Sequence, residues 1–104
     1  MNLIISNQVK NDIREIYKYV AKNSLKYANE TANNIYSRIA ELENSPYLGR
    51  YVPEISNKQY RELIYKSYRI VYSVTERTNN VYIHFVIHSK RNLKSFYKSY
   101  IKEN

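Results

Sequence analysis

Two neighbouring segments in the second half of the chain alternate between apolar and polar side chains, and they constrain the fold more than any other feature. They run from Tyr68 to Thr75 and from Val81 to His88, and a polar stretch that ends in two asparagines separates them. Because side chains of a strand point alternately to its two faces, this pattern predicts a β-hairpin. We expect the apolar residues of the two strands to share the core face; they are Ile70, Tyr72, Val74, Ile83, Phe85 and Ile87.

The opposite face of this hairpin carries cationic side chains. With the apolar sets on the core face, Arg69, His84 and His88 fall on the other face. Lys90 and Arg91 follow where the second strand ends. Guanidinium and imidazolium groups donate hydrogen bonds that suit phosphate oxygens, so this face predicts a phosphate-binding site. We expect His84, in the middle of its strand, to be a packed or solvated residue outside that site.

The first half of the chain predicts two amphipathic helices. Apolar residues recur at helical spacing over residues 9–20 and again from about residue 26 to residue 44. Ser6 or Asn7 offers an N-cap for the first helix. Its polar residues, Asp12 among them, are expected to form a solvated face of mixed charge. A short polar interruption separates the two helices, so they are predicted to form a helical hairpin.

Three further segments complete the predicted architecture. Residues 3–6 and 60–65 suggest strands, and residues 45–57, which hold both prolines and the only glycine, suggest a connection. Residues 93–101 repeat apolar side chains at helical spacing, with Lys94 on the basic outer side. We therefore predict an α+β fold, as a single domain over residues 1–104. A small antiparallel sheet carries the N-terminal helical hairpin on one face and is followed by a short C-terminal helix.

Positive charge is concentrated in the second half. Residues 1–44 carry six basic and five acidic side chains, whereas residues 45–104 carry eleven basic and four acidic ones. This asymmetry favours a polyanionic partner, either nucleic acid or an acidic protein segment. The alternative is a basic surface that serves only solubility.

Composition also excludes several classes of protein. The chain has no cysteine and two histidines, which rules out disulfides, thiolate metal sites and an all-histidine zinc site. We expect no metal and no small-molecule cofactor. No apolar run approaches the roughly 20 residues that span a bilayer, so we expect no membrane partner. The lack of cysteine fits a protein of the reducing cytoplasm.

Four short segments carry a likeness to known proteins. They are DIREIYKYVAKNS in the first helix, ELENSPYLGR after the second, YRELIYKSYRIVYSV across two strands, and VIHSKRNL at the end of the last strand. In this order and spacing they resemble the RelE/ParE superfamily of bacterial toxins from type II toxin-antitoxin modules, also called plasmid stabilisation proteins. The resemblance implies a toxin that arrests growth and a cognate antitoxin protein as its partner.

The superfamily has two branches with different targets. RelE-like members are metal-free endoribonucleases (mRNA interferases) that cleave mRNA in the ribosomal A site. ParE-like members inhibit DNA gyrase and are not nucleases. We expect mRNA cleavage, with the ribosome and mRNA as partners, and keep gyrase inhibition as the alternative. A non-toxic binding module of the same fold is a third possibility.

For the nuclease, the resemblance implies the site residues. Arg69 in YRIVY, with Arg91 and Tyr97 in KRNLKSFY, match catalytic positions of RelE-like enzymes. His88 is added as an acid or base, because imidazole titrates near neutral pH. The expected phosphate-binding or polyanion-binding residues are Arg61, Lys90 and Lys94. Tyr97 also lies on the apolar stripe of the last predicted helix, where packing against the core is the alternative role.

Overall fold

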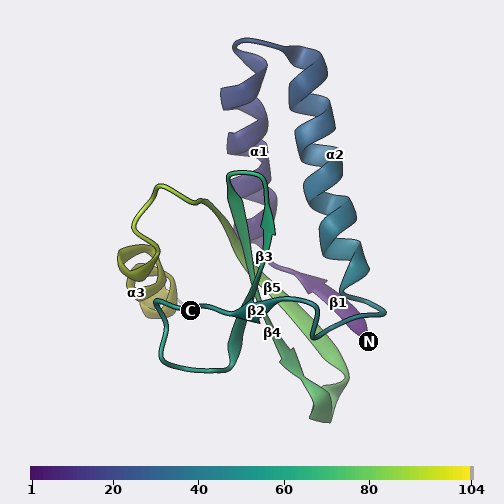
Figure 1. The fold of residues 1–104 in the computed structure, drawn as a ribbon, viewed down its shortest axis with the longest axis vertical. Helices are drawn as coiled ribbons and strands as arrows, with labels where there is room; N and C mark the ends of the chain where they lie inside the picture. Colours follow the sequence, from purple (N-terminus) through teal and green to yellow (C-terminus); the bar gives the residue numbers. More distant parts are fainter. Residues whose placement is uncertain (104) are drawn as a thin grey trace.

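The computed structural model describes residues 1–103 and arranges them as one sheet with α-helices around it (Figure 1). The elements in chain order are β1 (Asn2–Ile5), α1 (Asn7–Ala21), α2 (Leu25–Glu41), β2 (Arg50–Tyr51), β3 (Tyr60–Tyr65), β4 (Tyr68–Thr75), the 3-10 turn η1 (Glu76–Thr78), β5 (Asn80–His88) and α3 (Leu93–Glu103). The α+β class, the helical hairpin and the C-terminal helix are confirmed. The short strand β2 was not predicted.

Helices α1 and α2 form the hairpin that apolar periodicity predicts. Ser6 caps α1 and Ser24 caps α2, each hydroxyl accepting a hydrogen bond from the backbone N–H three residues on, at 3.1 and 3.0 Å. The buried residues of the two helices are Val9, Ile13, Ala28, Thr31, Ile35 and Ile39. In α1 they lie in the half nearer the sheet, whereas in α2 they run from Ala28, one turn into the helix, down to Ile39. The turn between α1 and α2 stands clear of the sheet in Figure 1.

The sheet has the strand order β1-β5-β4-β3-β2. Strands β3, β4 and β5 pair antiparallel, as expected, and the unpredicted β2 joins β3 in the same way. Strand β1, however, runs parallel to β5, with Leu3 opposite Val81. The sheet is therefore mixed. A strand that joins the sheet through two helices is not forced into the antiparallel direction by a tight turn.

A β-bulge at His84 divides β5 into two parts whose alternation differs. Val71 lies opposite Phe85, while the next residue of β4 lies opposite Ile83, so His84 has no partner in β4. One extra residue moves every later side chain to the other face. The prediction that Ile83 shares a face with Phe85 and Ile87 is therefore wrong.

The bulge lets β5 serve two separate cores, one on each face of the sheet. Ile83 and Val86 join the cluster under the helical hairpin. Phe85 and Ile87 pack on the other face under α3 and the segment after β2, in a cluster whose buried members are Val52, Ile55, Val71, Phe85, Ile87 and Leu93. The second face is thus a packed core rather than an open cationic surface. His88, which lies opposite Tyr68, falls on the hairpin side, so the prediction that it shares a face with Arg69 is wrong as well.

Gly49, just before β2, is required by a close approach of two backbones. Its φ is not left-handed. A Cβ there would lie 2.4 Å from the carbonyl oxygen of Glu62 and 2.7 Å from the hydroxyl of Tyr72. The Gly49 N–H donates a 2.8 Å hydrogen bond to that hydroxyl, which fixes the start of β2 against the sheet.

Candidate functional site

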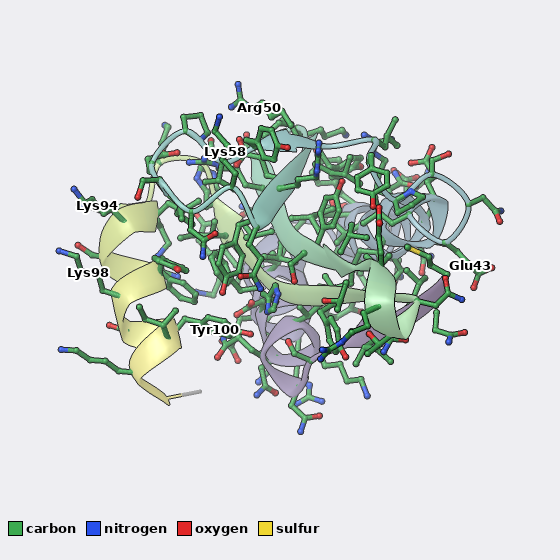
Figure 2. All side chains as sticks on the ribbon, turned by 90° about the horizontal axis from the view of Figure 1, so that it is seen from below. Glu43, Arg50, Lys58, Lys94, Lys98 and Tyr100 are labelled. Atoms are coloured by element: carbon green, nitrogen blue, oxygen red, sulfur yellow. The ribbon has the colours of Figure 1, made fainter. Side chains whose placement is uncertain are left out.

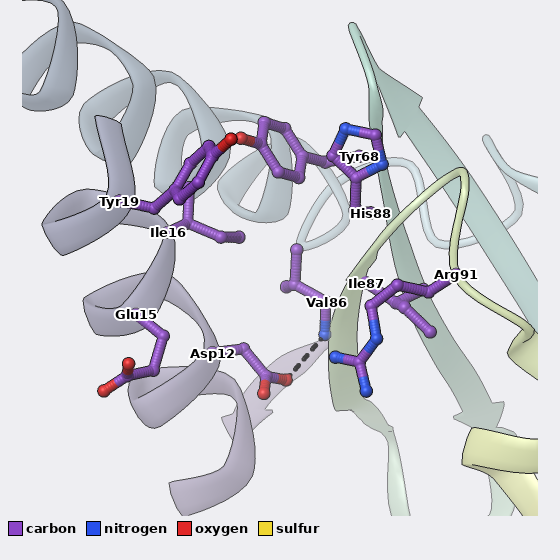
Figure 3. A pocket seen from close by; sticks show the side chains of 9 residues that line it. All are labelled: Asp12, Glu15, Ile16, Tyr19, Tyr68, Val86, Ile87, His88 and Arg91. Atoms are coloured by element: carbon purple, nitrogen blue, oxygen red, sulfur yellow. Dashed lines mark hydrogen bonds between the residues drawn. The ribbon is translucent and has the colours of Figure 1, made fainter. Parts of the chain in front are cut away.

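A groove of about 440 Å³ lies between α1 and the end of β5 (Figure 3). It is lined by Asp12, Glu15, Ile16, Tyr19, Tyr68, Val86, Ile87, His88 and Arg91. The acidic side chains, Asp12 and Glu15, come from α1, while the His88 imidazole comes from the end of β5 and the cationic Arg91 from the loop behind it. The groove thus has an apolar floor with charges of opposite sign on its two walls.

Asp12 joins α1 to the outer edge of β5. Strand β1 pairs with β5 only as far as Ile83, which leaves the edge beyond it without a strand partner. The Asp12 carboxylate accepts a 2.9 Å hydrogen bond from the Val86 N–H (Figure 3) and one of 2.7 Å from the side chain of Gln8. Burial raises the pKa of Asp12, while these hydrogen bonds and the charge of Arg91 act in the opposite direction. Asp12 is therefore a structural acceptor and not part of a solvated face as predicted.

His88 and Arg91 are the predicted catalytic residues that the groove brings together. The His88 ring lies edge-on to Tyr68, with ring centroids 5.5 Å apart, and its Nδ1 accepts a hydrogen bond from the Lys90 N–H at 3.1 Å. The guanidinium of Arg91 sits 5.1 Å from the ring centre of Phe96. Lys90 is exposed beside the groove but does not line it.

Arg69 lies away from the groove, in a network of ion pairs on the other face of the sheet. Its guanidinium donates to Glu62 at 2.6 Å and to the two oxygens of Glu54 at 2.6 and 2.7 Å. Arg50 donates to the other oxygen of Glu62 at 2.8 Å. The Arg69 side chain is 8% exposed and that of Glu62 is 0% exposed.

The carboxylates of this network offset the positive charge of Arg69. The hydrogen bonds to Glu54, followed by those to Glu62, raise the pKa of Arg69 above its usual value, although burial opposes them. In return, the hydrogen bonds from Arg69 lower the pKa of Glu54. The guanidinium charge of Arg69 therefore lies against two carboxylates, one of which it shares with Arg50.

Tyr97 and Lys94 lie on different sides of α3. The Tyr97 ring packs edge-on against Tyr60, with centroids 5.2 Å apart, in the core under the helix. Lys94 is exposed and points away from the sheet, as Figure 2 shows. Burial, together with Tyr97, raises the pKa of Tyr60 to about 12.

Arg61 stands at the other edge of the sheet, beside β2. It donates a 2.9 Å hydrogen bond to the carbonyl of Gly49 and lies 4.3 Å from the ring centre of Tyr51 and 5.2 Å from that of Tyr47. These contacts hold the β2 segment in place. The candidate residues are thus divided among four places, and no single site collects them.

His84 is packed, which is one of the two roles that the sequence suggested for it. Its Nε2 lies 2.7 Å from the hydroxyl of Ser73, and its Nδ1 lies 2.8 Å from the hydroxyl of Tyr100 on α3. Burial lowers the pKa of His84 to about 4, so the neutral ring joins the sheet to α3 at neutral pH.

Seven of the nine residues that line the groove were not predicted as site residues, Asp12, Tyr19 and Tyr68 among them. No local pattern marks them, because the contact between α1 and the edge of β5 depends on how far β1 extends. Among the side chains that the structure describes, those of residues 1–102, no three His, Asp or Glu groups come together to hold a metal ion. No helix in the described part of the chain is long and apolar enough to cross a membrane.

A small sheet covered by a helical hairpin on one face and by a C-terminal helix on the other is also the fold of solved ParDE and RelE toxin structures. Residues 3–93 match the sequence profile described as ParE toxin of type II toxin-antitoxin system, parDE. The chain belongs to this ParE toxin family. No curated protein sequence matches the chain significantly.

Solved structures share the fold at low sequence identity. The chromosomal ParDE toxin-antitoxin system from P. aeruginosa matches with a TM-score of 0.73 and 17% identity, over 86% of this chain and 97% of that one. The isolated RelE toxin of E. coli matches with a TM-score of 0.61 and 15% identity, over 98% and 96% of the two chains. The RelBE2 toxin-antitoxin complex from Mycobacterium tuberculosis matches with a TM-score of 0.55 and 16% identity, over 84% of this chain and 95% of that one.

Proposed function

We propose that this type II toxin arrests growth by binding and inhibiting DNA gyrase, as ParE-like toxins do, and that it does not cleave RNA. The observation that carries the proposal is the position of Arg69. The residue that matches the catalytic arginine of RelE-like enzymes is held by Glu54 and Glu62 in a buried network.

Cleavage of mRNA through its ribose 2′-OH needs cations that are free to meet the phosphate. The transition state is a phosphorane with extra negative charge, which such cations stabilise. A phosphate approaching Arg69 would have to displace Glu54 from a two-point contact and would still face the charge of Glu62. Tyr97, the matched tyrosine, is packed against Tyr60. The ion-paired Arg69 and the packed Tyr97 both argue against RNA cleavage, and they favour a toxin that acts by binding its target.

Family membership points the same way. The matched profile is that of ParE, and the ParDE structure has a higher TM-score to this chain than the two RelE-type structures described above. The sequence alone favours mRNA cleavage, whereas these comparisons favour gyrase inhibition.

We also propose that the toxin is bound by a cognate antitoxin and that it acts in the cytoplasm. Two structural neighbours are toxin-antitoxin assemblies, a ParDE system and a RelBE2 complex. The net charge of +8 attracts an acidic antitoxin segment, and exposed Lys90 and Lys94 form no ion pair within residues 1–103. We expect the affinity for the antitoxin to fall as the salt concentration rises.

Ribosome-dependent mRNA cleavage is the second candidate. The observation in its favour is that His88 and Arg91, an acid or base and a cation, line one groove. This arrangement lacks Arg69 and Tyr97, which lie elsewhere.

Two measurements on the protein separate these functions. Purified toxin is added to gyrase, relaxed plasmid and ATP, and the appearance of negative supercoils is followed on a gel. In parallel, mRNA 5′ ends are mapped in cells after induction. We expect loss of supercoiling with unchanged mRNA ends. New ends within A-site codons together with normal supercoiling would overturn the proposal.

A matched enzymatic control uses a type I topoisomerase that relaxes the same plasmid. A gyrase inhibitor leaves this reaction unchanged, whereas a basic protein that merely coats DNA slows both reactions.

A further inference from the structure

We propose that the tip of the α1–α2 hairpin is the surface by which this toxin binds an acidic, apolar patch on its target protein. We define the tip as residues 18–27, where α1 ends and α2 begins. The inference rests on the proposed function only in taking the target to be a protein.

The tip is not needed to complete the hydrophobic core. The last buried residue of α1 is Ile13 and the first of α2 is Ala28, so nothing in residues 14–27 is buried. In Figure 1 this end of the hairpin projects past the sheet. The helices are therefore longer than packing on the sheet requires.

The tip exposes large apolar side chains. Tyr19 is 69% exposed, Leu25 is 61% exposed and Tyr27 is 44% exposed. Aromatic and aliphatic side chains at a protrusion are typical of the centre of a protein interface, where their burial supplies most of the binding energy. Tyr19 also lines the groove beside α1, so the tip and the groove form a continuous surface.

Every charge at the tip is positive. Lys18, Lys22 and Lys26 are exposed, and Lys66 of the β3–β4 turn reaches over, with its Nζ 5.0 Å from the ring centre of Tyr27. No acidic residue occurs in residues 16–29. Lys18 contacts Glu15 at 3.6 Å, but both side chains are more than 60% exposed, so the pair neutralises little in solution. Lysines around an apolar centre fit carboxylates at the rim of a partner surface.

The apolar centre favours a protein over DNA as the occupant. Phosphate backbones are bound by cations and hydrogen-bond donors, and an exposed leucine gains nothing from them. Leu25 and Tyr19 gain binding energy only where a partner removes apolar surface from water.

The experiment uses two tip variants and two matched controls in the full chain. The first tip variant, Lys18→Glu/Lys22→Glu/Lys26→Glu, reverses the charge. Its control, Arg77→Glu/Lys98→Glu/Lys102→Glu, changes net charge equally at exposed cations elsewhere. The apolar tip variant is Tyr19→Ser/Leu25→Ser. Its control replaces two exposed apolar residues away from the tip, as Tyr36→Ser/Ile101→Ser.

Binding is measured by surface-immobilised toxin titrated with the gyrase A2B2 holoenzyme, and toxicity by growth after induction. We expect both tip variants to bind at least about tenfold more weakly and to lose growth arrest, since each removes several contacts at one interface. The controls should stay within about twofold of the unsubstituted toxin. Far-UV circular dichroism and the melting temperature show that each variant is folded.

The outcomes separate this inference from the proposed function. If the unsubstituted toxin does not bind gyrase, the proposed target fails, and growth arrest alone then tests the tip. Folded tip variants that still arrest growth like their controls overturn the inference. Loss of binding to a 20-base-pair duplex, with binding to gyrase unchanged, would identify the tip as a DNA contact and overturn it as well.

Discussion

Arg69 binds both carboxylate oxygens of Glu54, at 2.6 and 2.7 Å, and so fastens the segment between β2 and β3 to the face of the sheet under α3. The same guanidinium neutralises Glu62, which is fully buried. An arginine that the sequence suggests for catalysis therefore holds two parts of the fold together. Its removal should affect stability before it affects any chemistry.

We expect Arg69→Ala to lower the free energy of unfolding by about 3 kcal/mol, because it leaves Glu62 buried with only one partner. Arg50→Ala is the matched control. Its side chain pairs with the same carboxylate but is 63% exposed, so its loss should cost at most about 1 kcal/mol. Urea unfolding at pH 7 measures both values. Equal losses would show that burial does not set the strength of this network.

Ser6 should contribute more to the free energy of unfolding than Ser24, the N-cap of α2. Its hydroxyl accepts from the Val9 N–H and donates at 2.9 Å to the carbonyl of His84 at the bulge. We expect Ser6→Ala to cost about 2 kcal/mol, the sum of a lost cap and an unmet carbonyl. Ser24→Ala, which removes only an exposed cap, should cost about 1 kcal/mol. Thermal and urea unfolding compare the two, and identical losses would exclude a role for the His84 contact.

The protein should lose stability as the pH falls from about 6.5 to about 4, because of His84. Its pKa in the folded protein is about 4, against 6.5 for an ordinary histidine, so the unfolded chain takes up the proton first. This contribution is complete above pH 6.5 and is lost on acidification. Urea unfolding at pH 7 and pH 5 should show a larger fall for the unsubstituted protein than for His84→Asn.

The variant His88→Asn tests whether the second histidine accounts for the pH-dependent loss of stability. It should keep the fall in stability between pH 7 and pH 5. If instead His84→Asn keeps the fall and His88→Asn removes it, the assignment to His84 is wrong.

Tyr97→Phe should leave growth arrest unchanged, because the ring packs against Tyr60 and the proposed function gives its hydroxyl no chemical role. The measurement is growth after induction, with equal protein levels checked by immunoblot. Tyr100→Phe provides a comparison in which a tyrosine hydroxyl with a structural contact is lost. It removes the hydroxyl that contacts His84 and should lower the free energy of unfolding by about 1 kcal/mol. Loss of growth arrest by a stable Tyr97→Phe variant would support mRNA cleavage.

Local patterns along the chain were enough to predict the elements that depend on sequence neighbours. Helical periodicity and a cap at Ser6 or Asn7 predicted the helical hairpin, and the same periodicity predicted the C-terminal helix. Alternation around residues 68–88 predicted the central pair of strands. All of these patterns reflect local geometry. The expectation that Gly49 lies in a connection was also met, but the close approach to Glu62 that requires a glycine is visible only in the folded chain.

The faces and partners that those elements meet depend on contacts between residues far apart in the sequence. One unpaired residue at His84 reverses the alternation of β5, and nothing in the local pattern marks it. Arg69 meets Glu54 and Glu62 because β3, β4 and a loop come together there, and Asp12 meets Val86 because β1 ends early. Such charged and hydrogen-bonded contacts depend on positions far apart in sequence, so the candidate site could not be assembled from the sequence.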